Sequence, residues 1–212
     1  MRSERRVRWI RLMTVACVGW MSACLPYAMG STAATARPDE LHMSTKFSII
    51  RLADSAIGTT RTPSAMTYDL EFRTGLDERS DMGVRITTAS GVVGSYKRRL
   101  AGDDTRGGVA LQVEGGVVNM ADHVMGGISL VGSNKEYGPI GAFGGLRMLA
   151  VAPIAEGAAR DQATIGGFFG ARLEFLTFTA FPEIGVYYDR SALHLRNSSV
   201  IFVPSFSIRR SR

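Results

Sequence analysis

Residues 68–73, Tyr-Asp-Leu-Glu-Phe-Arg, alternate apolar and charged side chains without a break. The same alternation recurs in residues 82–87 and 109–114, and in most of the chain after residue 40. Successive side chains of a β-strand point to opposite faces, so a period of two predicts strands that are covered on one face. Because the polar face carries charges and the apolar face is spread over every strand, we expect a closed barrel with an apolar exterior.

The alternation and the turn residues between its stretches predict an all-β fold, a single antiparallel up-and-down β-barrel of about ten strands (eight to twelve) behind a cleavable signal peptide. A soluble sandwich or a lipocalin-like barrel also shows a period of two and is the alternative fold. The expected strands are 41–52, 66–75, 81–89, 92–100, 107–118, 123–132, 139–151, 163–175, 177–189 and 198–208.

The N-terminus is basic over residues 1–11 and apolar over residues 12–23. A charged region followed by a short apolar stretch is typical of a secretory signal, and this stretch is shorter than the roughly 20 residues of a spanning helix. We therefore expect residues 1–24 to be a signal peptide, 25–40 a flexible lead-in, 41–209 the barrel and 210–212 a basic tail.

Two cleavage sites are compatible with this leader. Met21-Ser22-Ala23-Cys24 resembles a bacterial lipobox, which makes Cys24 a candidate for lipidation. Ala34-Thr35-Ala36 is an A-x-A pattern that favours ordinary cleavage further along the chain. The other cysteine, Cys17, also lies in the leader, so the rest of the chain has no internal disulfide.

Most of the formal charge of +6 belongs to the leader. Residues 1–24 contain five of the 25 basic side chains and one of the 19 acidic ones, which leaves 20 and 18 in the remainder. The basic balance therefore does not indicate binding to nucleic acid.

Charged side chains gather on the polar face of the expected strands. Unpaired buried charge costs several kcal/mol, so inside a narrow barrel these groups have to pair, and we expect a paired network that fills the lumen. A pore or ligand cavity is the alternative, although ten strands make a much smaller barrel than the roughly 16–18 of an open porin. The expected lumen residues are Asp69, Glu71, Arg73, Arg85, Lys97, Arg99, Glu114, Arg147, Arg172, Glu174 and Glu183.

Three segments resemble small bacterial outer-membrane β-barrel proteins: residues 74–85 resemble a barrel turn, 181–188 the penultimate strand and 203–208 the closing strand. The resemblance covers roughly residues 66–208 and implies a membrane barrel without a shared catalytic motif. One departure is the C-terminus. Such barrels usually end in an aromatic residue, whereas Phe206 is followed here by Ser-Ile and a basic tail.

No constellation of catalytic or metal-binding residues stands out in the sequence. His42, His123 and His194 fall on different expected elements, and no metal-ligand spacing joins them, so we predict no metal site, no cofactor and no catalytic residue. The alternative is a membrane-embedded lipid hydrolase that uses His194 with nearby serines, namely Ser191, Ser198 and Ser199.

These observations favour a bacterial outer-membrane barrel with a structural, envelope or small-solute role and no catalysis. Its expected partner is outer-membrane lipid, with a small solute or a protein as a further candidate, and its oligomeric state stays open. The alternative is an exported lipoprotein, lipid-anchored in the periplasm, whose soluble β-fold binds a ligand or partner.

Overall fold

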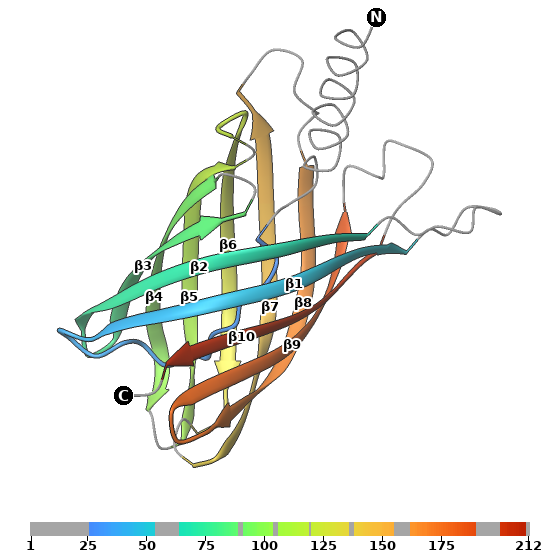
Figure 1. Cartoon of the computed structure of the whole chain (residues 1–212). Helices are drawn as coiled ribbons and strands as arrows, with labels where there is room; N and C mark the ends of the chain where they lie inside the picture. The colour runs from blue at the N-terminus through green and yellow to red at the C-terminus, as the bar shows by residue number, and fades with distance from the viewer. Residues whose placement is uncertain are drawn as a thin grey trace, which may run out of the picture.

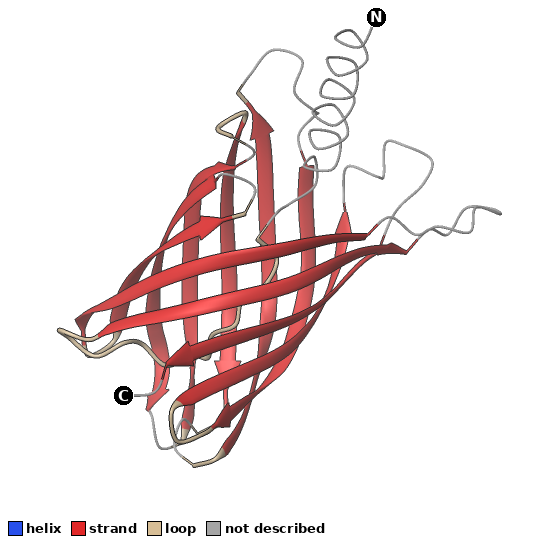
Figure 2. Cartoon of the chain, viewed as in Figure 1, coloured by secondary structure: helices blue, strands red, loops and turns tan. Residues whose placement is uncertain are grey.

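Ten antiparallel strands form a closed barrel (Figures 1 and 2). The computed structural model describes residues 26–53, 64–88, 91–103, 106–118, 120–135, 138–154, 162–189 and 200–210. The strands are β1 (Leu41–Ala53), β2 (Ser64–Asp77), β3 (Ser80–Thr87), β4 (Gly91–Asp103), β5 (Gly107–Val118), β6 (His123–Ser133), β7 (Ile140–Pro153), β8 (Gln162–Glu174), β9 (Phe178–Asp189) and β10 (Val200–Arg210).

Each strand pairs with its neighbours in the sequence, and β1 closes the barrel against β10, with Phe47 opposite Phe206. The predicted up-and-down barrel is therefore confirmed, and each expected strand matches an observed one to within three residues. The alternative of a two-sheet sandwich is wrong because the single sheet leaves no free edge. No helix in the described residues is long and apolar enough to cross a membrane.

The two faces of the sheet differ as the alternation predicts. Apolar side chains such as Val84 and Ile184 point outward and are about half exposed, whereas Lys46 and Arg147 point into the lumen and are each 1% exposed. On the exterior, the rings of Phe47 and Tyr68 meet edge to face across β1 and β2, 5.0 Å apart. A lipocalin-like soluble barrel has the opposite arrangement, with polar side chains outside.

The two ends of the barrel differ in their connections. The first strand begins and the last strand ends at the same end, which we call the turn end; it also holds the short turns that follow β2, β4 and β8 (Figure 1). The opposite end, called here the loop end, receives the three longest connections, residues 54–63, 154–161 and 190–199. With an even number of strands, the first strand begins and the last strand ends on the same side of the barrel, as they do here.

The segment before the first strand lies inside the barrel. Residues 26–36, called here the axial segment, run through the lumen from the loop end towards the start of β1 (Figure 1). Tyr27, Ala28 and Met29 are at most 3% exposed, so the structure differs from the flexible lead-in expected for residues 25–40. The physical reason is that lumen side chains bind the segment's backbone, as described below; residues 37–39 are exposed where the segment leaves the lumen.

The sheet extends one residue beyond the expected barrel end at residue 209, into the expected basic tail of residues 210–212. Arg209 and Arg210 both belong to β10, where the guanidinium of Arg209 lies 5.0 Å from the ring centre of Phe181. The leader and Cys24, together with residues 211–212, lie outside the described residues.

Candidate functional site

Most of the large lumen side chains near the loop end are apolar. Tyr27 of the axial segment packs there against Tyr187 of β9, with ring centres 5.0 Å apart. The surrounding side chains come from strand positions close to the long connections, so they form an apolar layer that closes this end of the lumen around Tyr27. Its other members are Ile50, Val93, Val118, Met125, Leu149, Val151, Ile201 and Val203.

On the turn-end side of this layer, the carboxylate of Glu71 forms ion pairs with three cationic side chains. Lys46 Nζ of β1 lies 2.8 Å from Glu71 Oε2, and guanidinium nitrogens of Arg73 and Arg85 each lie 3.3 Å from Glu71 Oε1. All four side chains are nearly or fully buried. One carboxylate therefore holds together charges from three adjacent strands, β1, β2 and β3.

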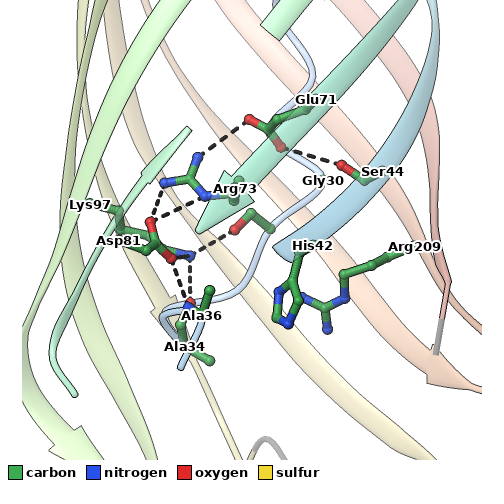
Figure 3. Close-up of a pocket in the computed structure, with 11 residues that line it drawn as sticks. Gly30, Ala34, Ala36, His42, Ser44, Glu71, Arg73, Asp81, Lys97 and Arg209 are labelled. Carbon is green, nitrogen blue, oxygen red and sulfur yellow. Dashed lines mark hydrogen bonds and ion pairs between the residues drawn. The ribbon is translucent and has the colours of Figure 1, made fainter. Parts of the chain in front are cut away.

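Two further ion pairs extend this network around the lumen. Asp81 accepts a hydrogen bond from Arg73, and its Oδ2 lies 3.5 Å from Lys97 Nζ. Figure 3 shows these three side chains. On the other side of the lumen, the guanidinium of Arg147 pairs with Glu114. These ion pairs therefore place cations and carboxylates side by side around the axial segment.

Of the eleven residues expected in the lumen, nine are buried there, with exposed fractions between 1% and 8%. Arg99 is half-buried and donates to Thr35 Oγ1 at 3.1 Å. Glu174 is 49% exposed at the turn end, where it pairs with Arg172 at 2.8 Å. The nine buried residues are Asp69, Glu71, Arg73, Arg85, Lys97, Glu114, Arg147, Arg172 and Glu183.

Asp69 stands apart from the other lumen carboxylates. It is 1% exposed, and neither of its oxygens has a hydrogen-bond partner among the described residues. The lumen network is thus mostly, but not completely, paired.

Sequence reasoning missed two members of this network, Lys46 and Asp81. Lys46 lies between Ser44 and Ser48 on the polar face of β1, so the period of two carried the signal. Asp81 is the second residue of β3, close to the turn that precedes this strand. Aspartate is a common turn residue, so its position did not indicate a lumen contact. Its contact with the axial segment could not be read from the strand pattern.

Charged lumen side chains bind the main chain of the axial segment. At the loop end, Arg147 Nη1 and the hydroxyl of Tyr187 both donate to the carbonyl of Tyr27. Further into the lumen, the N–H groups of Met29 and Gly30 donate to the two carboxylate oxygens of Glu183, at 3.0 and 2.8 Å. These bonds use backbone atoms, so they fix the position of the segment's main chain in the lumen.

The same pattern continues to the turn end (Figure 3). Lys97 Nζ donates to Ser31 Oγ at 3.0 Å and to the carbonyls of Thr32 and Ala34. The N–H of Ala36 donates to Asp81 Oδ2 at 2.9 Å. The axial segment is therefore bound along its length.

A cavity of about 20 Å³, room for roughly one water molecule, lies beside the axial segment. Polar groups from both the segment and the wall line it, among them Ser31, His42, Arg73 and Lys97 (Figure 3). It is too small for a nutrient-sized solute. Around the axial segment, the alternative of a wide pore or ligand cavity therefore finds no support.

Gly30 of the axial segment lies too close to the barrel wall to accommodate a side chain. Its φ is +53°, and a Cβ placed on it would lie 2.0 Å from Ser207 Oγ. Gly30→Ala is therefore expected to lower the free energy of unfolding by about 2–4 kcal/mol, from backbone strain together with overpacking. Urea unfolding in detergent, followed by circular dichroism, measures it.

The matched control for this variant is Gly94→Ala. A Cβ at Gly94 points outward and meets its nearest atom at 3.7 Å, so the change should stay within about 0.5 kcal/mol. Equal stabilities of the two variants would contradict the close packing of the axial segment against β10.

The two described histidines, His42 and His123, lie in different parts of the barrel. His42 lies 3.1 Å from Glu40 near the turn end, and His123 is buried at the start of β6. No group of three or more His, Cys, Asp or Glu side chains that could hold a metal occurs in the described part of the chain. His194 and the three serines of the hydrolase alternative lie outside it.

No protein-family model and no curated protein matches the chain. Among solved structures, the chain is similar to Neisserial surface protein A, with 9% identity over 81% of this chain and 97% of that one and a TM-score of 0.42. It is also similar to Ail, the attachment invasion locus protein of Yersinia pestis (8% identity, 80% and 97% covered, TM-score 0.30) and to the outer membrane protein OprG from Pseudomonas aeruginosa (11%, 85% and 97%, 0.32). At these TM-scores the likenesses do not bear on function, and a membrane placement has to rest on the exterior of this barrel.

Proposed function

We propose that this protein is a non-enzymatic bacterial outer-membrane β-barrel with a structural, envelope role, whose lumen is closed by its own axial segment. The observation that carries the proposal is the combination of a filled, charged lumen with an apolar exterior. Large apolar side chains are exposed on all ten strands, a distribution that a soluble monomer avoids.

Charged side chains on the exterior lie towards the barrel ends. Arg51 is two residues from the end of β1, and Arg98 pairs with Ser80, the first residue of β3. Strands of 8 to 14 residues are close to the roughly 9–11 that a tilted strand needs to span a bilayer. An apolar band with charges at its edges supports insertion into lipid.

A closed lumen favours the structural role over passage of small solutes. Apolar side chains surround Tyr27 at the loop end, and charged side chains bind the segment from Met29 to Ala36. The purified protein in planar lipid bilayers should therefore show no stepwise conductance. It should also fractionate with outer membranes and migrate differently on gels before and after heating.

Two outcomes would overturn this proposal. Release of the protein by a mild salt wash would exclude insertion into the membrane. Regular conductance steps from the unaltered protein would show that the lumen passes ions, and would favour the small-solute role.

If the apolar exterior faces lipid, the cost of adding a charge to it should depend on the depth of that position in the bilayer. Val113 lies in the middle of β5 and faces outward, so Val113→Arg is expected to cost about 2–4 kcal/mol of unfolding free energy in lipid vesicles. Leu41 is the first residue of β1, at the turn end, and Leu41→Arg should cost only about 0–1 kcal/mol. Urea titration of both variants measures the difference; equal costs would contradict a lipid-facing band.

A further inference from the structure

We propose that the lumen is a binding site for an extended peptide, and that its occupant is residues 26–36 of the mature protein itself. It follows that the leader is removed upstream of Pro26 and that the new N-terminus emerges at the loop end. The placement of that end outside the cell rests on the proposed function; the retention of the segment does not.

The site recognises a peptide main chain. The carbonyl of Pro26 accepts from Arg85 at 3.3 Å, and the carbonyl of Met29 accepts from Lys46. Glu183 and Asp81 accept N–H groups of the same segment, as described above. Ser133 Oγ of β6 also accepts from the N–H of Ala33 at 3.2 Å. Donors and acceptors from six strands thus meet complementary backbone atoms of the axial segment.

The side chains of the segment fit the same description. Most are small, as in residues 30–36, Gly-Ser-Thr-Ala-Ala-Thr-Ala, which leaves room for the long lumen side chains around them. Two are large, and each fills an apolar pocket: Tyr27 lies in the layer at the loop end, and Met29 packs with Phe143, Phe168 and Phe181. The ligand class is therefore an extended peptide with small side chains and two apolar anchors.

The fit of residues 26–36 in the lumen distinguishes between the two cleavage sites that the sequence allows. Cleavage after Ala36 would remove the whole axial segment and would leave Lys46, Lys97 and Glu183 without the backbone partners that they have in the structure. Cleavage at the lipobox-like stretch before Cys24 keeps every one of these bonds. The arrangement of the lumen therefore favours processing upstream of Pro26.

The direction of the segment follows from its contacts. Tyr27 lies among side chains next to the long connections, whereas Pro38 forms a bridge with Gly75, two residues before the end of β2 at the turn end. Residues upstream of Pro26 are thus attached at the loop end. In an outer-membrane barrel with an even number of strands the long loops face outward, so the N-terminus is displayed on the cell surface.

The first experiment is intact-mass spectrometry of the full chain expressed with its leader and purified from membranes. We expect a mature protein that lacks the leader and begins at or before Pro26, with added acyl mass if Cys24 is lipidated. A protein that begins at Arg37 would overturn the proposal. This measurement is independent of the orientation of the barrel.

The second experiment tests the direction with one short epitope, placed in separate versions of the full chain before Pro26, within residues 190–199, or after Arg212. Antibody should reach the first two epitopes on intact cells and the third only after permeabilisation. If the 190–199 epitope is reached but the one before Pro26 is not, the threading direction is wrong. If neither is reached on intact cells, the membrane orientation of the proposed function fails, while the mass measurement still decides whether the segment is retained.

Discussion

Replacing Glu71 by Gln is expected to lower the free energy of unfolding by about 3–5 kcal/mol, the cost of breaking a buried ion pair by removing one partner. Glu71 is the shared acceptor of Lys46, Arg73 and Arg85, and it is 2% exposed. A neutral amide leaves these three cations close together, and its NH2 group adds a donor where only acceptors are needed. Urea unfolding of the protein in lipid vesicles, followed by circular dichroism, measures the loss.

The matched control is Glu174→Gln. Glu174 also accepts from an arginine, Arg172, but its side chain is half exposed, so the same substitution should cost less than about 1 kcal/mol. Similar losses for the two variants would contradict a special role of the buried acceptor.

A double variant isolates the charge effect. Arg85→Met in the Glu71→Gln background removes one of the three crowded cations, while Lys46 and Arg73 keep the Met29 carbonyl and Asp81 as acceptors. We expect a favourable coupling energy of about 1 kcal/mol or more between the two substitutions. A double variant that is merely the sum of the two single losses would show that the charges do not interact.

The strand pattern made the barrel predictable because one physical rule governs every strand. A residue such as Val84 must face outward if Arg85 faces the lumen, and the register follows from the pairing of neighbours, as with Arg85 opposite Glu71. The closed, charge-lined architecture could therefore be inferred from periodicity. The departures have local causes: Glu174 is the last residue of β8 and lies at the rim, and Arg99 lies beside a register shift in β4.

The axial segment could not be predicted in the same way. Residues 26–36 have no period of two and consist mostly of small side chains, which in sequence are typical of a flexible linker. Their order comes from the lumen, where groups such as Lys97 and Glu183 bind backbone atoms. Backbone recognition leaves little trace in the sequence of the bound segment. The sequence signal lay instead in the barrel strands, because their charged lumen side chains have more hydrogen-bonding groups than they can satisfy among themselves.

Deleting residues 26–36 is expected to lower the free energy of unfolding by about 3–6 kcal/mol. Tyr27 and Met29 are almost fully buried, and burial of such side chains stabilises by about 1.5–3 kcal/mol each. The backbone bonds to Lys97, Arg147 and Glu183 are also lost. We expect water entering the emptied lumen to replace most of them, so the two side chains set the size of the effect. Unfolding in urea, with the unaltered mature chain as reference, measures it.

A synthetic peptide with the sequence of residues 25–37 should restore much of this loss when it is added to the deletion variant. A ligand that binds only the folded state at about 100 times its dissociation constant stabilises it by about 2.7 kcal/mol. The same peptide with Gly30 replaced by Val is the control, because a Cβ at that position collides with Ser207. Rescue by both peptides alike would show that the lumen does not discriminate the shape of its occupant. A deletion variant as stable as the intact chain would contradict the structural role of the segment.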